Sequence, residues 1–222
     1  MGDRERKVSV PKIEVGYGMA REDDACLAGA KASRQALGSI RNHPLSTVLV
    51  FASVRYDLHH LLSEIQNAMG DVPVFGVSTA GEICNGSHEK SVVVVALASP
   101  HLAVRIGIGG AVSADWQGAV HQAVSNPSLS PFFSAHDNTI WDEMTQRGES
   151  AFGVVFSPGN TRHADSRGHE ILVELKRLSL GRLPLFGGCA ADDWLMEANY
   201  IFLGNRAYPD SVLLAVDRKS VV

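Results

Sequence analysis

The chain has 222 residues, of which 45% are hydrophobic, and its 20 Lys and Arg are outnumbered by 24 Asp and Glu for a formal net charge of -4. Proteins that bind nucleic acid present a basic stripe to the phosphates, so this scattered and slightly acidic charge predicts no nucleic-acid partner. The longest apolar run, at residues 91–98, is far shorter than the roughly 18 residues that a membrane span needs, so no membrane partner is expected either.

The cysteines indicate the compartment. Cys26, Cys84 and Cys189 are odd in number and far apart, which is not the pattern of a disulfide framework. The first ten residues lack the apolar stretch of a signal peptide. We therefore expect a protein of the cytoplasm.

Strands and helices alternate in the first half of the chain. β-Branched and aliphatic runs predict strands, and leucines spaced by three and four predict an amphipathic helix. Asp23 is expected to cap the first helix, and Gly70 to end the second. In order, we expect a strand at 12–18, a helix near 23–38, a strand at 47–51, a helix at 57–69, the strand VPVFGV and a strand at 91–98.

The second half repeats this order. A strand at 103–109, a helix near 115–125 that Asp115 could cap, a strand at 152–156 and a helix at 168–180 are followed by the strand LPLFGG and by strands at 200–204 and 211–216. Residues 126–150 have no counterpart in the first half and are interpreted as an insertion. Its aromatic side chains, Phe132, Phe133 and Trp141, are expected to pack onto the fold.

An internal repeat supports this duplicated order. Residues 72–83 align without gaps with residues 183–194, with identical Pro, Phe, Gly and Ala at four positions. We therefore predict an α/β fold of two related mixed-sheet halves with crossover helices, arranged as a pseudo-twofold duplication. The expected organisation is a tail at 1–11, a domain at 12–218 with halves of about 12–100 and 101–218, and a tail at 219–222.

The two repeated segments carry a family resemblance. VPVF followed by GVSTAGEI, and LPLFGG followed by AADD, resemble the N-terminal part of the FIST sensory domain over roughly residues 12–218. The resemblance implies an intracellular sensor of small ligands, with amino acids as the expected class, that is often attached to signalling output domains or to an F-box. It implies no catalytic machinery and no cofactor. Because FIST proteins usually continue into a C-terminal domain, this chain is expected to lack that domain.

The loop after the first repeated strand is a candidate ligand site. Ser78, Thr79, Gly81 and Glu82 follow a strand end, where hydroxyls and backbone N–H groups can hold a carboxylate or another anion. The alternative is a tight structural turn, because glycine allows close approach with or without a ligand.

The corresponding loop of the second half is acidic. Gly187, Gly188, Asp192 and Asp193 could admit and recognise an amino group, although turn capping by the aspartates is the alternative. Arg55, just beyond another strand end, is the best partner for a carboxylate. If the loops share one cleft, they would suit a zwitterionic amino acid.

Enzymatic interpretations are disfavoured by context. The sequence GVSTA approximates a nucleophile elbow but leads into a strand instead of a helix, and no histidine in the sequence is placed beside Cys189. GIGIGG lacks the third glycine of a dinucleotide loop. The histidines lack metal-ligand spacing. We therefore expect no enzyme, no catalytic residue, no cofactor and no metal.

The predicted function is a small-ligand-sensing module of a signal-transduction protein, with an amino acid or similar metabolite as its partner. The alternative is a scaffold or adaptor that acts through a signalling or ubiquitin-ligase protein.

Overall fold

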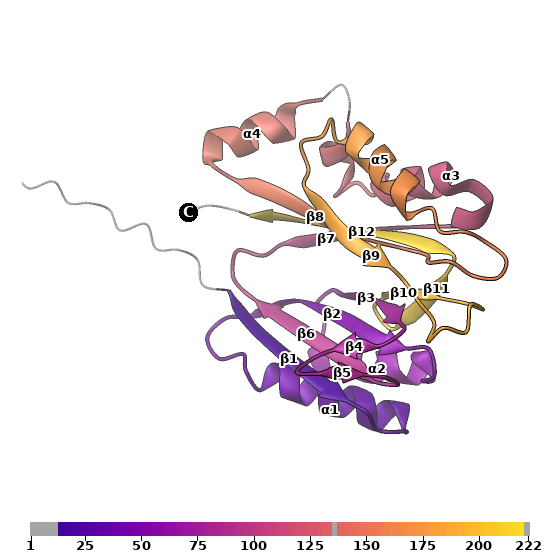
Figure 1. The fold of residues 1–222 in the computed structure, drawn as a ribbon. Helices are drawn as coiled ribbons and strands as arrows, with labels where there is room; N and C mark the ends of the chain where they lie inside the picture. The colour runs from indigo at the N-terminus through magenta and orange to yellow at the C-terminus, as the bar shows by residue number, and fades with distance from the viewer. Residues whose placement is uncertain (1–12, 135–136, 220–222) are drawn as a thin grey trace, which may run out of the picture.

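The computed structural model describes residues 13–134 and 137–219. Figure 1 shows four layers, in which two β-sheets face each other and helices cover the outer face of each sheet. The predicted tails at 1–11 and beyond residue 219 lie outside the described residues. This architecture places apolar side chains on both faces of each sheet, which is why the strands are continuous aliphatic runs.

The first half supplies most of a six-stranded sheet in the order β1-β6-β2-β3-β10-β11. Strands β2 and β3 run parallel because helix α2 crosses between them, and the other neighbours are antiparallel. Its elements are β1 (Glu14–Ala20), α1 (Ala25–Leu37), β2 (Leu45–Ser53), α2 (Leu58–Met69), β3 (Val74–Thr79), β4 (Glu82–Ile83), β5 (Ser87–His88) and β6 (Val92–Ala98).

The second half supplies a four-stranded sheet in the order β7-β12-β8-β9. Here α5 crosses between the parallel strands β8 and β9. The elements are β7 (Val104–Gly110), α3 (Val112–Val124), the 3-10 helix η1 (Ser130–Phe133), α4 (Thr139–Arg147), β8 (Ser150–Ser157), α5 (Gly168–Leu178), β9 (Leu185–Cys189), β10 (Tyr200–Leu203), β11 (Arg206–Pro209) and β12 (Ser211–Lys219).

The predicted duplication is confirmed by the strand order. β1-β6-β2-β3 in one sheet and β7-β12-β8-β9 in the other place corresponding strands in corresponding positions. The hairpins that follow β3 and β9 differ. β4 and β5 form a separate two-stranded sheet, whereas β10 and β11 leave their own half and extend the first sheet beside β3. The expected boundary near residue 100 therefore divides the chain but not the sheets.

Three apolar clusters hold the layers together. One lies between α1, α2 and the first sheet, and a second lies between α3, α4, α5 and the second sheet. The third lies between the two sheets, where Phe156 of β8 contacts Phe51 and Phe75 with ring centroids 6.1 Å and 6.2 Å apart. The inter-sheet cluster is what joins the halves.

Two predicted helix starts need correction. Asp24, not Asp23, caps α1, because its carboxylate accepts the N–H of Leu27 at 2.8 Å. Helix α3 begins at Val112, three residues before the predicted start. Asp115 is non-helical within α3 and accepts the N–H of Gly118 at 2.9 Å, so it caps the turn after a kink.

The insertion forms part of the second core. Phe132 and Phe133 are buried, and Trp141 packs edge-on against Phe132 at a centroid distance of 5.8 Å. All three predicted aromatic side chains therefore contribute to packing. Within the described part of the chain, no helix combines the length and apolar character required to cross a membrane.

Candidate functional site

The carboxyl ends of β3 and β9 meet, so the two repeated loops lie in direct contact. The N–H of Ala191 donates to the carbonyl of Ser78 at 2.9 Å, and the Ser78 hydroxyl donates to the carbonyl of Ala191 at 2.7 Å. The same hydroxyl accepts the N–H of Tyr200 at 2.8 Å. Ser78 is buried and joins the two halves through three hydrogen bonds.

Glu82 of the first loop is a buried carboxylate. It accepts hydrogen bonds from the hydroxyls of Thr79 and Ser91, and Gly81 before it has a φ of +145°. Burial raises the pKa of Glu82, the two hydroxyls oppose this shift, and the negative charge of Asp193 adds to it. This carboxylate faces inward, so its contacts are those of a structural turn.

Asp193 of the second loop pairs with the predicted carboxylate partner, Arg55. The Asp193 carboxylate accepts the Ser53 hydroxyl at 2.5 Å and lies 3.7 Å from Nε of Arg55. Its side chain is 7% exposed, whereas that of Arg55 is 47% exposed. The two groups predicted to hold opposite ends of a ligand therefore contact each other, and only the guanidinium reaches solvent.

Asp192 shapes the segment that follows it. Its carboxylate accepts backbone N–H groups from Met196, Glu197 and Ala198 at 3.0 Å, 2.6 Å and 3.0 Å. Three donors on one carboxylate fix the course of this loop without secondary structure. Asp192 therefore makes the contacts expected from the alternative interpretation, in which the aspartates of this loop cap a turn.

Gly187 and Gly188 lie on β9, away from the contact between the loops. A Cβ on Gly187 would lie 1.7 Å from the carbonyl oxygen of Val155, so glycine is required there for the parallel pairing. The glycines line a cavity of about 470 Å³ that also contains Cys189 and His169. A histidine therefore does share a cavity with Cys189, which sequence spacing did not reveal.

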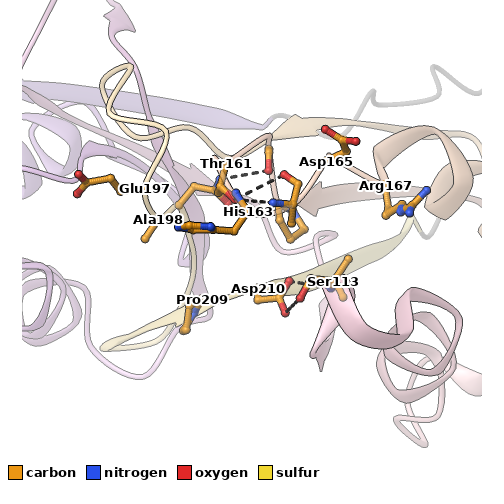
Figure 2. Close-up of a pocket in the computed structure, with 14 residues that line it drawn as sticks. Ser113, Thr161, His163, Asp165, Arg167, Glu197, Ala198, Pro209 and Asp210 are labelled. Atoms are coloured by element: carbon orange, nitrogen blue, oxygen red, sulfur yellow. Dashed lines mark hydrogen bonds between the residues drawn. The ribbon is translucent and has the colours of Figure 1, made fainter.

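A second cavity, of about 250 Å³, lies at the carboxyl ends of β7 and β8. Its walls are the start of α3 at 112–113, the loop at 158–167 after β8, the segment at 197–199 and the turn at 209–210 before β12. Figure 2 shows Ser113 and Asp210 across from the Thr161–Arg167 loop, with Glu197 and Arg167 on opposite sides. Asp192 therefore positions one wall of this cavity.

The cavity carries side chains of both charges. Arg167 and His163 supply cationic or hydrogen-bonding groups, while Asp165 and Glu197 supply carboxylates. Asp210 is already held by the N–H and hydroxyl of Ser113 at 2.9 Å and 2.7 Å. Nη1 of Arg167 also donates to Oε1 of Glu170 at 3.0 Å, an ion pair with a residue outside the cavity lining.

The sequence carries a signal for part of this cavity. The loop at 158–167 follows the strand at 152–156, and strand ends are where α/β proteins bind ligands. Residues 112–113 and 209–210 gave no signal, because only the pairing of β12 with β7 brings them beside that loop. Among residues 13–134 and 137–219, no group of three His, Cys, Asp or Glu could hold a metal ion.

Comparisons with known proteins give a family and a set of neighbours. The family model of the FIST N domain matches residues 46–222. No curated protein matches the chain. A solved cyanuric acid hydrolase, described as an evolutionary innovation by structural concatenation, is 11% identical with a TM-score of 0.47, covering 98% of this chain and 72% of its own. The cyanuric acid hydrolase of A. caulinodans is 10% identical with a TM-score of 0.40, covering 96% and 73%.

These neighbours correct one prediction. The expectation that the chain is not an enzyme was wrong, because both of these solved structures are hydrolases. The absence of a recognised elbow or triad in the sequence therefore does not exclude catalysis. At 10–11% identity and TM-scores below 0.5, the likeness assigns no reaction or catalytic residue to this chain.

Proposed function

The chain belongs to the FIST N domain family, and on that premise we propose that it senses an amino acid or a similar small metabolite in the 250 Å³ cavity. FIST domains are small-ligand sensory domains of signalling proteins. The cavity and the contact between the repeated loops both lie within the matched residues 46–222. The proposed setting is a signalling protein of the cytoplasm.

The mixed charge of the cavity is the observation that carries this proposal. In this proposal, His163 and Arg167, which is also paired with Glu170 at 3.0 Å, hold a ligand carboxylate, and Asp165 and Glu197 hold an ammonium group. A volume of 250 Å³ is below the roughly 300–1,000 Å³ of cavities for drug-sized ligands, which favours a small metabolite. His163, Asp165 and Arg167 share the loop at 158–167, whereas Glu197 comes from a segment about 30 residues further along the chain, so only the folded chain assembles the set.

The predicted site residues have a second role in this proposal. Asp192 holds Glu197 and Ala198 at the cavity wall, and its neighbour Asp193 bonds to Ser53 and pairs with Arg55 of the other half. A ligand that shifts the 196–198 segment would therefore act on the contact between the halves. We propose this contact, which includes Ser78, as the route by which the bound state is reported.

A thermal-shift screen with amino acids and related metabolites tests the proposal. A ligand at a hundredfold excess over its dissociation constant stabilises a folded protein by about 2.7 kcal/mol. We expect a hit to raise the melting temperature of the wild type and to lose its effect in Arg167→Ala and Glu197→Ala. Arg147→Ala and Glu89→Ala, exposed and away from the cavity, are the matched controls.

The outcomes separate the two candidate functions. If no metabolite raises the melting temperature of well-folded protein, ligand sensing by this chain is refuted. If a hit persists in both cavity variants, the ligand binds elsewhere and the cavity is the wrong site. A stable signalling or ubiquitin-ligase partner in a pulldown, together with no metabolite hit, supports the adaptor alternative.

A further inference from the structure

Strand β9 leaves one edge of the second sheet open. It pairs with β8 on one side, and no described residue forms a ladder on its other side. Its sequence, LFGGC, contains no charge or proline, and its ladder with β8 has no bulge. Natural sheets protect exposed edges with such features or cover them with another element. An unprotected edge of this kind indicates that something covers it.

The duplication supplies an internal comparison for this edge. Phe75 of β3 is 2% exposed, whereas Phe186 at the corresponding position of β9 is 54% exposed. On the covering helices, Leu62 of α2 is 0% exposed, whereas Val173 of α5, at the same offset as the repeated strands, is 54% exposed. Both pairs occupy equivalent places in the two halves, so the same apolar surface is covered in one half and open in the other.

In the first half, the covering element is an antiparallel hairpin. β10 pairs with β3, and Phe202 joins the cluster that contains Leu62, while Ile201 joins the cluster that contains Phe75. In that register, Phe202 lies opposite Gly76. An aromatic residue facing glycine across a strand pair fills the space that glycine leaves.

Self-pairing of β9 also places an aromatic residue opposite a glycine, although at Gly188, one position beyond Gly187, the counterpart of Gly76. Suppose that two copies of β9 pair antiparallel with Gly187 of one opposite Gly187 of the other. The twofold symmetry then places Phe186 of each copy opposite Gly188 of the other. A Cβ at Gly188 would meet nothing within 4 Å, so this space is open to a neighbouring ring. The strand is therefore self-complementary in the way that a twofold interface requires.

We propose that the chain forms a twofold homodimer in which β9 of each copy pairs antiparallel, joining two four-stranded sheets into one. The same symmetry brings the exposed Leu172 and Val173 of α5 against α5 of the second copy. Pairing β9 with itself covers the open β9 edge of both copies at once, and the joined sheet then ends in β7 of each copy. This assembly goes beyond ligand sensing and does not depend on it.

Sedimentation velocity over a range of protein concentrations tests the dimer. We expect the wild type to self-associate and Phe186→Lys and Leu172→Lys each to weaken association roughly tenfold or more, because each places a charge in the apolar contact. Ile83→Lys is the matched control, since Ile83 is 89% exposed on the separate hairpin β4–β5 and is not part of the interface.

Far-UV circular dichroism establishes that each variant is folded. The two interface variants lie on different elements, β9 and α5, so either one alone can test the dimer if the other does not fold. The proposal is overturned if the wild type is monomeric at every concentration. It is equally overturned if the folded interface variants associate as tightly as the wild type, because the second copy would then bind elsewhere.

Discussion

Glu82 and Glu14 are carboxylates in opposite electrostatic settings. Burial is the main cause that raises the pKa of Glu82 above its usual 4.5. The pKa of Glu14 falls to about 2, chiefly because its carboxylate accepts the backbone N–H of Asn42, with further N–H groups from Arg41 and His43. Ionised Glu82 therefore costs stability, and ionised Glu14 contributes it.

The Glu82→Gln variant should be more stable than the wild type at neutral pH. A raised pKa means that the folded state binds the proton more tightly, so the free energy of unfolding rises as the pH falls through the folded pKa toward 4.5. The advantage of the neutral amide should shrink over the same range. Urea unfolding at neutral and acidic pH measures the difference, and an advantage independent of pH would contradict the assignment.

Glu14→Gln should behave in the opposite way. The contribution of Glu14 is present above 4.5 and is lost as the pH falls from there toward about 2. The variant should therefore be less stable than the wild type at neutral pH, with the gap closing in acid. Because both substitutions remove one carboxylate, the opposite signs separate the local environments from any effect of net charge.

The parallel strand pairs of both halves depend on one glycine in each repeated strand, β3 and β9. A Cβ would lie 1.8 Å from the Val50 carbonyl oxygen at Gly76 and 1.7 Å from the Val155 carbonyl oxygen at Gly187. In both cases the obstacle is backbone, which cannot rotate away. The shared glycine of the repeated segments is therefore explained by close packing of neighbouring strands, without reference to a ligand.

Gly187→Ala and Gly188→Ala form a matched pair for this explanation. We expect Gly187→Ala to lower the free energy of unfolding by about 3 kcal/mol, because the methyl group must displace β8. Gly188→Ala, with open space at its Cβ, should change it by less than about 0.5 kcal/mol. Chemical denaturation at concentrations that keep the chain monomeric measures both, and similar losses would refute the packing argument.

The whole molecule should unfold as one unit, because the halves share a sheet and a core. The hairpin β10–β11 extends the first sheet, and Phe156 of the second sheet packs on Phe51 and Phe75 of the first. Neither half can lose its structure without exposing apolar surface of the other. Cooperative unfolding is the consequence.

Truncation of Phe156 tests this interlock. Phe156→Ala should cost about 3–5 kcal/mol by opening a cavity between the sheets, while the transition stays single. Trp116, Trp141 and Trp194 all lie in the second half, so tryptophan fluorescence reports that half and far-UV circular dichroism reports both. Coincident midpoints are expected, and separate midpoints would show that the halves unfold independently.

The sequence by itself determined the α/β class, the duplicated order of strands and helices, and the family, because periodicity and the repeated Pro, Phe, Gly and Ala are local signals. The tertiary structure alone decided that β10–β11 joins the other half's sheet, that Asp193 pairs with Arg55 instead of facing it across a ligand, and that four separate segments enclose the charged cavity. The physical reason is sequence separation. Ser53 and Asp193 are 140 residues apart in the sequence. A hydrogen bond between residues so far apart in the chain produces no pattern in the sequence around either of them.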